Sequence, residues 1–174
     1  FPLDDSGTGD KRRTADCNYG GTPATPTTIA ADDSYEPHTA EGVDTTAHNE
    51  FLCESSTTYD TTAPGLSNDL VISKTAMIHA IGLTPFDYSL MAQSGTSLIW
   101  SPRSNISLYG NTADVAAATA LGVNIALGTD WMPSGSMNLL RELKCAASFN
   151  ETYLHSALSA KQLWEMVTSN PRTR

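Results

Sequence analysis

Short apolar runs and longer amphipathic segments alternate along most of this chain. Each apolar run has the length of a buried strand, and a polar or ionisable residue stands at or just after its end. Turn residues such as Gly122 and Gly128 bound the last of these runs. We therefore expect four strands, over residues 35–38, 75–79, 96–100 and 124–130.

The segments between these runs carry the spacing and end signals of helices. Thr84-Pro85-Phe86-Asp87 combines a cap, a first-turn proline and an acidic residue, and Gly95 supplies the stop. Helices are expected over residues 43–54, 84–95, 112–121, 137–147 and 159–169. Strictly alternating strands and helices predict parallel strands joined by right-handed crossovers.

The remaining segments read as loops. Residues 1–33 are dense in Gly, Pro, Thr and Asp without a sustained period, so we expect an irregular, loop-rich segment followed by one α/β domain over residues 34–174. Residues 55–68 read as a polar loop. Residues 101–105 read as a turn between a strand and the next helix, although Arg103 there could meet an anionic group of a substrate.

Length and charge narrow the class of protein. The 174 residues suffice for one domain but fall short of a complete (β/α)₈ barrel, which takes about 250 residues. A net charge of −9 argues against nucleic acid and anionic membranes as partners. No run approaches the roughly 20 apolar residues of a membrane helix. We expect a soluble protein, either cytoplasmic or exported.

The three cysteines do not form a metal-binding motif. Cys17, Cys53 and Cys145 are far apart and no Cys-x-x-Cys is present, which argues against a thiolate zinc site. A Cys17–Cys53 disulfide would suit an exported protein, but the sequence does not decide it.

Ionisable residues stand where the expected strands end. His38 and His79 could bind a divalent metal, Glu41 could transfer protons, and Asp130 could do either. Taken singly, each also fits a structural role: a backbone-bonded or core histidine, a helix-terminal charge, or a cap. Parallel strands that each deliver one such group to the same edge are typical of a barrel active site. His48 and His155 read as surface residues.

Four motifs in order resemble the metal-dependent amidohydrolase superfamily. They are His38-Thr39-Ala40-Glu41-Gly42, Ile78-His79-Ala80-Ile81-Gly82-Leu83, Ser101-Pro102-Arg103-Ser104-Asn105 and Leu127-Gly128-Thr129-Asp130. The resemblance is to the branch of cytosine deaminase, chlorohydrolase and imidazolonepropionase-like enzymes, and only to its C-terminal half. It implies a partial TIM-type barrel of about strands 5–8 with their helices.

The resemblance also implies roles. His38 and Asp130 would bind the metal, most often zinc, with iron or manganese as alternatives. Glu41 would be the proton shuttle, Asp130 also a base, and His79 would contact the substrate or the nucleophilic water, or bind metal. Arg103 and Trp131 would contact a small-molecule substrate. The implied reaction is hydrolysis by metal-activated water at a carbon that bears an amino, amide or halide leaving group.

The sequence departs from the family pattern in its metal ligands, which argues against activity of this chain in isolation. The superfamily carries a metal-binding His-x-His pair on its first strand, and no two of the four histidines here are two residues apart. The alternative is therefore a catalytically inactive fragment or pseudoenzyme. A half barrel also leaves an open sheet edge, so we expect self-association or pairing with the missing half.

Overall fold

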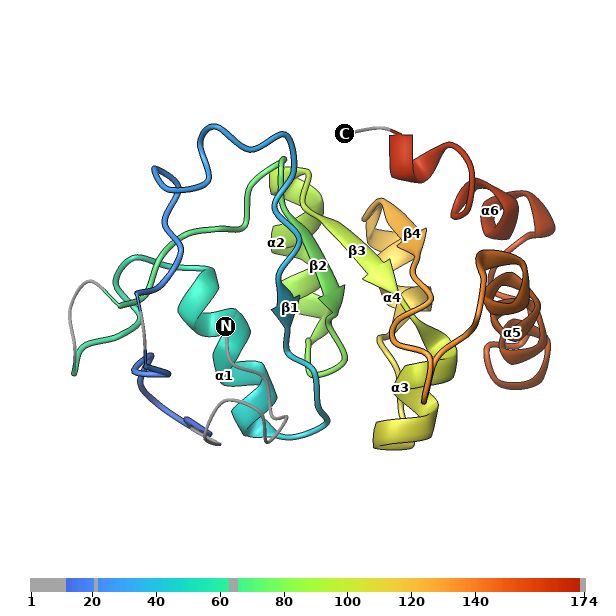
Figure 1. Cartoon of the computed structure of the whole chain (residues 1–174), viewed down its shortest axis with the longest axis horizontal. Coiled ribbons are helices and arrows are strands. Elements are labelled where there is room, and N and C mark those ends of the chain that lie inside the picture. Colours follow the sequence, from blue (N-terminus) through green and yellow to red (C-terminus); the bar gives the residue numbers. More distant parts are fainter. Residues whose placement is uncertain (1–11, 21, 63–65, 173–174) are drawn as a thin grey trace.

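The chain folds around a parallel sheet. The computed structural model describes residues 12–20, 22–62 and 66–172, and the strands in these ranges run in the order β1-β2-β3-β4, as Figure 1 shows. All three neighbouring pairs are parallel. The strands are β1 (His38–Thr39), β2 (Ala76–His79), β3 (Ser97–Trp100) and β4 (Ile125–Leu127). The expected α/β class with parallel strands is confirmed.

Helices follow every strand. They are α1 (Thr45–Glu54), α2 (Pro85–Ser94), α3 (Pro102–Tyr109), α4 (Val115–Leu121), α5 (Leu139–Tyr153) and α6 (Ala160–Glu165), followed by the 3₁₀ turn η2 (Asn170–Arg172). Figure 1 places α1 beyond β1, and α5 and α6 beyond β4. None of the helices in the described ranges combines the length and the apolar character needed to cross a membrane.

Local capping chemistry sets the ends of α2. The Thr84 hydroxyl accepts from the backbone N–H of Asp87, and the Asp87 carboxylate accepts from the backbone N–H of Thr84. Together these bonds form a capping box, which satisfies N–H groups that a helix N-terminus otherwise leaves without partners. Gly95 ends the helix at φ 75°, a left-handed conformation that glycine adopts without a steric penalty. The start and the stop expected from the sequence are both confirmed.

The helix α3 corrects the sequence-based reading. Residues 101–105 were expected to form a turn with a loop up to Thr112, but Pro102 begins a helix that ends at Gly110. Five residues, 110–114, then separate α3 from α4, which begins at Val115 after an Asp114 cap rather than at Thr112. Other bounds shift as well. β1 spans His38–Thr39 rather than residues 35–38, and β4 spans Ile125–Leu127 rather than residues 124–130. α5 extends to Tyr153, and α6 ends at Glu165 rather than near Ser169.

The main core lies between the sheet and its helices. The bulkiest members of this core, with no exposed surface, are Trp100, Tyr88, Phe51, Met77 and Met91. The Tyr88 hydroxyl donates to the carbonyl of Ala80, so the buried phenol has a partner. This core holds the strand ends of β2 and β3 in fixed positions.

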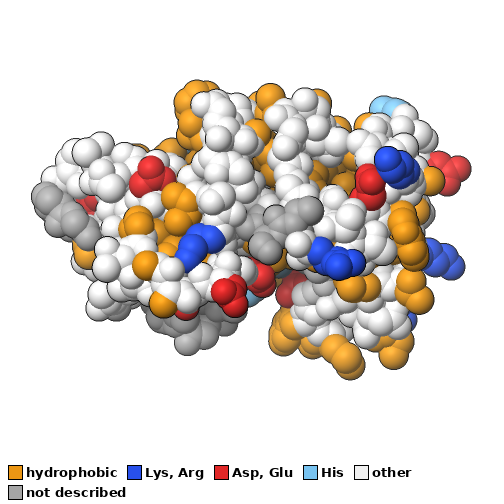
Figure 2. Space-filling view, turned by 90° about the horizontal axis from the view of Figure 1, so that it is seen from above, with side chains coloured by type: hydrophobic (Ala, Val, Ile, Leu, Met, Phe, Trp, Pro, Cys, Tyr) orange, Lys and Arg blue, Asp and Glu red, His pale blue; other side chains and the backbone are white. Residues whose placement is uncertain are grey.

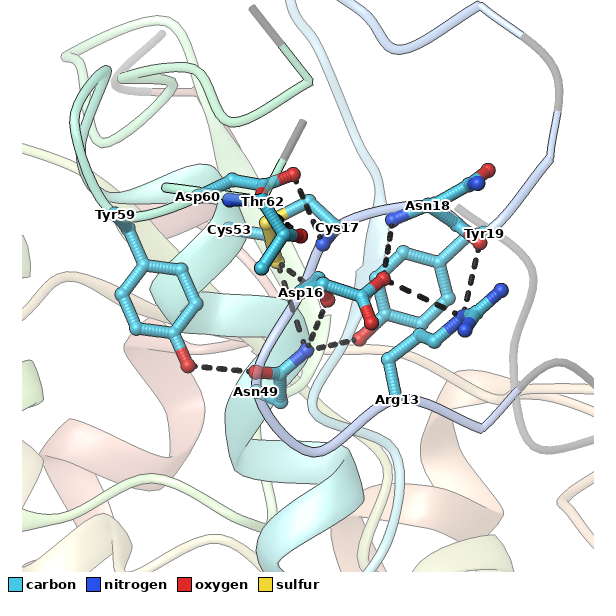
Figure 3. A network of polar contacts seen from close by, with 10 residues as sticks. All are labelled: Arg13, Asp16, Cys17, Asn18, Tyr19, Asn49, Cys53, Tyr59, Asp60 and Thr62. Atoms are coloured by element: carbon cyan, nitrogen blue, oxygen red, sulfur yellow. Dashed lines mark hydrogen bonds and ion pairs between the residues drawn. A yellow bond between two sulfur atoms is a disulfide. The ribbon is translucent and has the colours of Figure 1, made fainter. Parts of the chain in front are cut away.

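The N-terminal segment is anchored on α1. Residues 12–20 and 22–33 contain no helix or strand, and residues 1–11 and 21 of the expected irregular segment lie outside the described ranges. Cys17 forms a disulfide with Cys53 of α1. Beside it, the Asn49 amide donates to the Tyr19 hydroxyl and to the Asp16 carbonyl (Figure 3). The structure thus makes the pairing that the sequence left open, and Cys145 remains a free thiol.

Candidate active site at the C-terminal edge of the sheet

The backbone at the strand ends adopts an uncommon conformation. Outside glycine, φ is positive at only six of the described residues, and four of them stand just at or after strand ends. These four are Ala40 (52°), His79 (73°), Ala80 (50°) and Asp130 (54°). Such conformations cost free energy and cluster at functional sites, where the surrounding structure holds them. Here the Glu50 carboxylate accepts from the Ala40 N–H at 2.9 Å, which helps to hold the turn after β1.

Three side chains converge at this edge. His38, Glu41 and His79 each offer one ligand atom, and these atoms lie within 4.8 Å of one another. The two imidazole centroids are 5.1 Å apart. His79 Nε2 lies 3.4 Å from Glu41 Oε1. Both Glu41 and His79 are buried, and this is the one cluster of its kind among the described residues.

A tyrosine that the sequence analysis missed orients Glu41. The Tyr109 hydroxyl, at the end of α3, donates to Glu41 Oε1 at 2.9 Å. Sequence reasoning could not find this contact, because it depends on a helix that was not expected. The bond fixes one carboxylate oxygen beside His79.

Asp130 approaches the same edge from β4. Its Oδ1 accepts from the N–H of Trp131 at 2.7 Å, while Oδ2 is buried without a hydrogen-bond partner. Burial lowers the pKa of His79, and the Asp130 charge partly opposes that change. Asp130 is not in the tight group of His38, Glu41 and His79, although its carboxylate is close enough for this effect.

Burial dominates the electrostatics of His79. Removal from water lowers the pKa of this imidazole, the Asp130 charge opposes that change and His38 adds to it, and together they bring the pKa from 6.5 to about 4. His79 is therefore neutral near pH 7. Its Nε2 is buried and has no hydrogen-bond partner, whereas Nδ1 lies 2.9 Å from the Asn105 amide nitrogen.

Arg103 and Trp131 occupy other positions. The Arg103 Nε donates to Ser136 Oγ, and its backbone N–H donates to the buried carboxylate of Glu142. Arg103 lines an open groove of about 1250 Å³ between α3 and α5, which none of the residues His38, Glu41, His79 and Asp130 lines. The Trp131 side chain is exposed.

The two remaining histidines differ from each other. His155 is exposed, as expected. His48 was expected at the surface, but it is partly buried and its Nε2 lies 3.0 Å from the Asp87 carboxylate. Asp87 thus both closes the capping box of α2 and pairs with α1, and this pairing draws His48 inward.

The donor set at this edge suits a divalent cation. Two imidazoles and carboxylates are ligands that zinc takes in proteins. The buried, unpartnered Asp130 Oδ2 is an acceptor that has no protein donor, so a cation would satisfy it. Among the described residues, His38, Glu41 and His79 offer ligand atoms close enough together to hold such an ion, and Asp130 could contribute its Oδ2 from the same edge.

In its sequence the chain is similar to proteins that are named as deaminases. No family model matches. Over 101 residues the chain is 36% identical to a 5-methylthioadenosine/S-adenosylhomocysteine deaminase of Clostridium tetani, which covers 56% of this chain and 24% of the relative. It is 33% identical over 95 residues to a 5'-deoxyadenosine deaminase of Methanothrix thermoacetophila, covering 53% and 23% of the two chains.

A solved structure supports the fold. An adenosine deaminase from Xanthomonas campestris with bound zinc superposes with a TM-score of 0.63 and 24% identity, covering 82% of this chain and 33% of that one. The resemblance to the metal-dependent amidohydrolase superfamily is confirmed, as is the partial barrel. The chain spans about a quarter of the length of the curated relatives it matches.

Proposed function

We propose that this chain supplies part of the active site of a metal-dependent hydrolase of the amidohydrolase type. The observation that carries the proposal is the buried convergence of His38, Glu41 and His79 at the carboxyl ends of parallel strands. Asp130 approaches the same edge with a buried oxygen that lacks a partner.

The substrate class that we propose is a small molecule with an exocyclic amino group, such as an adenine nucleoside. Two relatives at 33–36% identity are deaminases of methylthioadenosine, S-adenosylhomocysteine or 5'-deoxyadenosine by name. Deamination therefore has more support than dehalogenation or amide hydrolysis. Arg103 and Trp131 remain proposed substrate contacts, and each would reach a substrate only at the outer part of the site.

Zinc is the cation that we propose, held by His38 and Asp130 with further ligands from the part of the relatives that this chain does not span. Bound there, the cation supplies one thing: it lowers the pKa of a water so that hydroxide is available near neutral pH. Iron or manganese would supply the same chemistry with a different preference for ligands.

Glu41 then manages the protons. Its carboxylate is buried, and the Tyr109 hydroxyl holds Oε1 at a position 3.4 Å from His79 Nε2. Glu41 accepts the proton that the attacking water loses and delivers it to the nitrogen that leaves as ammonia. Asp130 acts as a second base, and His79 contacts the substrate or the attacking oxygen.

The incomplete sheet suggests a partner for this chain. In the described sheet β1 and β4 are outer strands, and outer strands pair readily with other chains. Large hydrophobic side chains on and before α5 are also exposed, among them Met132, Met137, Leu140 and Tyr153. Figure 2 shows such side chains at several places on one face. We propose pairing with the rest of the barrel or self-association, and a monomer in sedimentation velocity at micromolar concentration would contradict self-association.

A titration with zinc, monitored by calorimetry, tests the proposed metal site. Wild type should bind one zinc, and His38→Ala and Asp130→Asn should each weaken binding at least tenfold. The matched control is His155→Ala, which removes an exposed histidine outside the cluster and should change nothing. If His38→Ala binds zinc as wild type does, the proposed site is wrong.

The proton-transfer role has its own test. With zinc present, ammonia release from 5'-deoxyadenosine would be measured for wild type and Glu41→Gln. Glu41→Gln should retain zinc and lose activity by at least a hundredfold. Zinc binding with no ammonia release by wild type would favour the inactive alternative, in which the chain keeps the scaffold without the reaction.

A further inference from the structure

We propose that Trp100, Thr112 and Asn105 form a directed hydrogen-bond chain that fixes the tautomer of His79, with its proton on Nε2. The three are positioning residues that act through His79. The tautomer follows from the structure alone, whereas its use in catalysis rests on the proposed function.

The chain of bonds is short and buried. Trp100 Nε1 donates to Thr112 Oγ1 at 2.7 Å, and Thr112 Oγ1 donates to Asn105 Oδ1 at 3.1 Å. The Asn105 amide nitrogen lies 2.9 Å from His79 Nδ1. Trp100, Asn105 and His79 have no exposed surface, and Thr112 is 9% exposed, so water does not compete for these groups.

The indole fixes the direction of every bond. An indole N–H can only donate, so Thr112 Oγ1 accepts from Trp100 and keeps its own hydrogen for Asn105. The Asn105 oxygen is then the acceptor on that side, and its NH₂ group faces His79. Because NH₂ only donates, His79 Nδ1 must accept, and a neutral imidazole then carries its hydrogen on Nε2.

The reverse arrangement would leave a buried group without a partner. If the Asn105 amide were flipped, Thr112 Oγ1 would receive hydrogens from both Trp100 and Asn105. Within the described part of the chain, the acceptor for the Thr112 hydroxyl hydrogen is Asn105 Oδ1, and that hydrogen would then lose it. An unsatisfied buried donor is unfavourable, so the chain favours one orientation.

The consequence lies at Nε2. This atom is buried, has no hydrogen-bond partner, and stands 3.4 Å from Glu41 Oε1. With a hydrogen on Nε2, His79 can donate a hydrogen bond, either to a substrate atom or to the attacking oxygen. The same hydrogen removes the lone pair that a metal ligand needs. Of the two roles open to His79, the structure therefore favours the donor over the ligand.

Long-range ¹H–¹⁵N NMR on the full chain with ¹⁵N-labelled histidine reports the tautomer directly. In the metal-free wild type at pH 7, His79 should show a protonated Nε2 and an unprotonated Nδ1. Adding zinc should leave this pattern in place. An Nδ1–H pattern in the wild type, or direct coordination of zinc by His79 Nε2, would overturn the inference.

Two variants test the chain of bonds itself. Asn105→Asp replaces the donor with a carboxylate acceptor, so Nδ1 should become protonated. Thr112→Val removes the hydroxyl that orients the amide, so the pure Nε2–H signal should be lost to a mixture. An unchanged His79 pattern in both variants would contradict the inference.

The controls separate this effect from misfolding. Thr119→Val makes the same replacement of a hydroxyl by a methyl group, at a buried hydroxyl that has no hydrogen-bond partner. It should therefore leave the His79 pattern unchanged. The signals of His48, which pairs with Asp87, report the integrity of the fold in every sample. If Asn105→Asp fails to fold, the wild-type spectrum still tests the tautomer of His79, and the comparison of Thr112→Val with Thr119→Val still tests the role of the hydrogen-bond chain.

The spectra also keep this inference apart from the proposed function. The tautomer is read without cation or substrate, so a chain that binds no zinc would still show it. A chain that binds zinc at His38 and Asp130 but carries Nδ1–H on His79 would contradict the tautomer and leave the metal site standing.

Discussion

Replacing Glu54 with glutamine should make the free energy of unfolding depend less on pH. Glu54 lies at the end of α1 with no exposed surface, and its Oε2 accepts from the Thr39 hydroxyl at 2.6 Å in β1. Burial raises its pKa from 4.5 to about 7, and the bond from Thr39 opposes that change. A difference of this size corresponds to about 3 kcal/mol between the two protonation states.

The sign follows from the raised pKa. Between pH 4.5 and pH 7 the folded chain binds this proton more tightly than the unfolded chain, so the stabilisation is complete below pH 4.5 and is lost as pH rises through 7. Glutamine matches the protonated acid in shape and charge and can accept from Thr39. Between pH 5 and pH 8 the wild type should therefore lose about 2 to 3 kcal/mol relative to Glu54→Gln.

Urea unfolding followed by tryptophan fluorescence at pH 5, 6, 7 and 8 measures this difference. All other titrating groups are common to the two chains, so their contributions cancel in the comparison. The two stabilities should be similar at pH 5 and diverge by pH 8, with the variant more stable. Parallel pH profiles would refute the reasoning, because they would mean that Glu54 does not titrate between folded and unfolded states as its burial requires.

Two further predictions concern the segments that frame the site. The Cys17–Cys53 disulfide joins residues 36 apart. Substitution of both cysteines with serine should lower the free energy of unfolding by about 2 to 4 kcal/mol. The control Cys145→Ser, at a free cysteine, should change it by less than about 1 kcal/mol. Gly135→Ala should weaken zinc binding at least tenfold in calorimetry, because the new Cβ would collide with the Thr129 carbonyl oxygen and displace the loop that carries Asp130. Gly122→Ala, where a Cβ meets nothing within 4 Å, should cost some stability at its φ of 89° and leave zinc affinity unchanged.

The strand ends could be predicted because their signals are local. Each strand is a short apolar run with turn residues beside it, and β2 and β3 end at His79 and Trp100, as expected. Parallel strands bring their carboxyl ends to one edge, so the sequence also predicted that His38, His79 and Asp130 would converge there. His38 and His79 do lie close together, with Glu41, whereas Asp130 is not in that tight group. The capping boxes of α2 and α6 are local in the same way.

The helix α3 was not predicted because its sequence carries only weak helix signals. Ser101 makes no side-chain cap bond, and half of the eight residues of α3 are polar, so no clear apolar period marks the helix. Pro102 at the first position and Gly110 after the last were the available signals. Without α3, the contacts of Tyr109 with Glu41 and of Asn105 with His79 had no basis in the sequence.

The disulfide could not be predicted for a different reason. Cys17 lies in a segment without periodicity, and its partner is 36 residues away on α1. Only the three-dimensional path of residues 12–20 brings the two sulfurs together, with Asn49 and Tyr19 bonded beside them. Sequence spacing carries no information about such a path.

Anomalous diffraction from a crystal of the chain grown with zinc tests the central claim most directly. The account predicts a zinc peak at the C-terminal edge of the sheet, bound by His38 and Asp130 with Glu41 adjacent, and its loss in Asp130→Asn. A zinc peak that appears only elsewhere, for example at the exposed His155, would contradict the claim that these strand ends form a metal site.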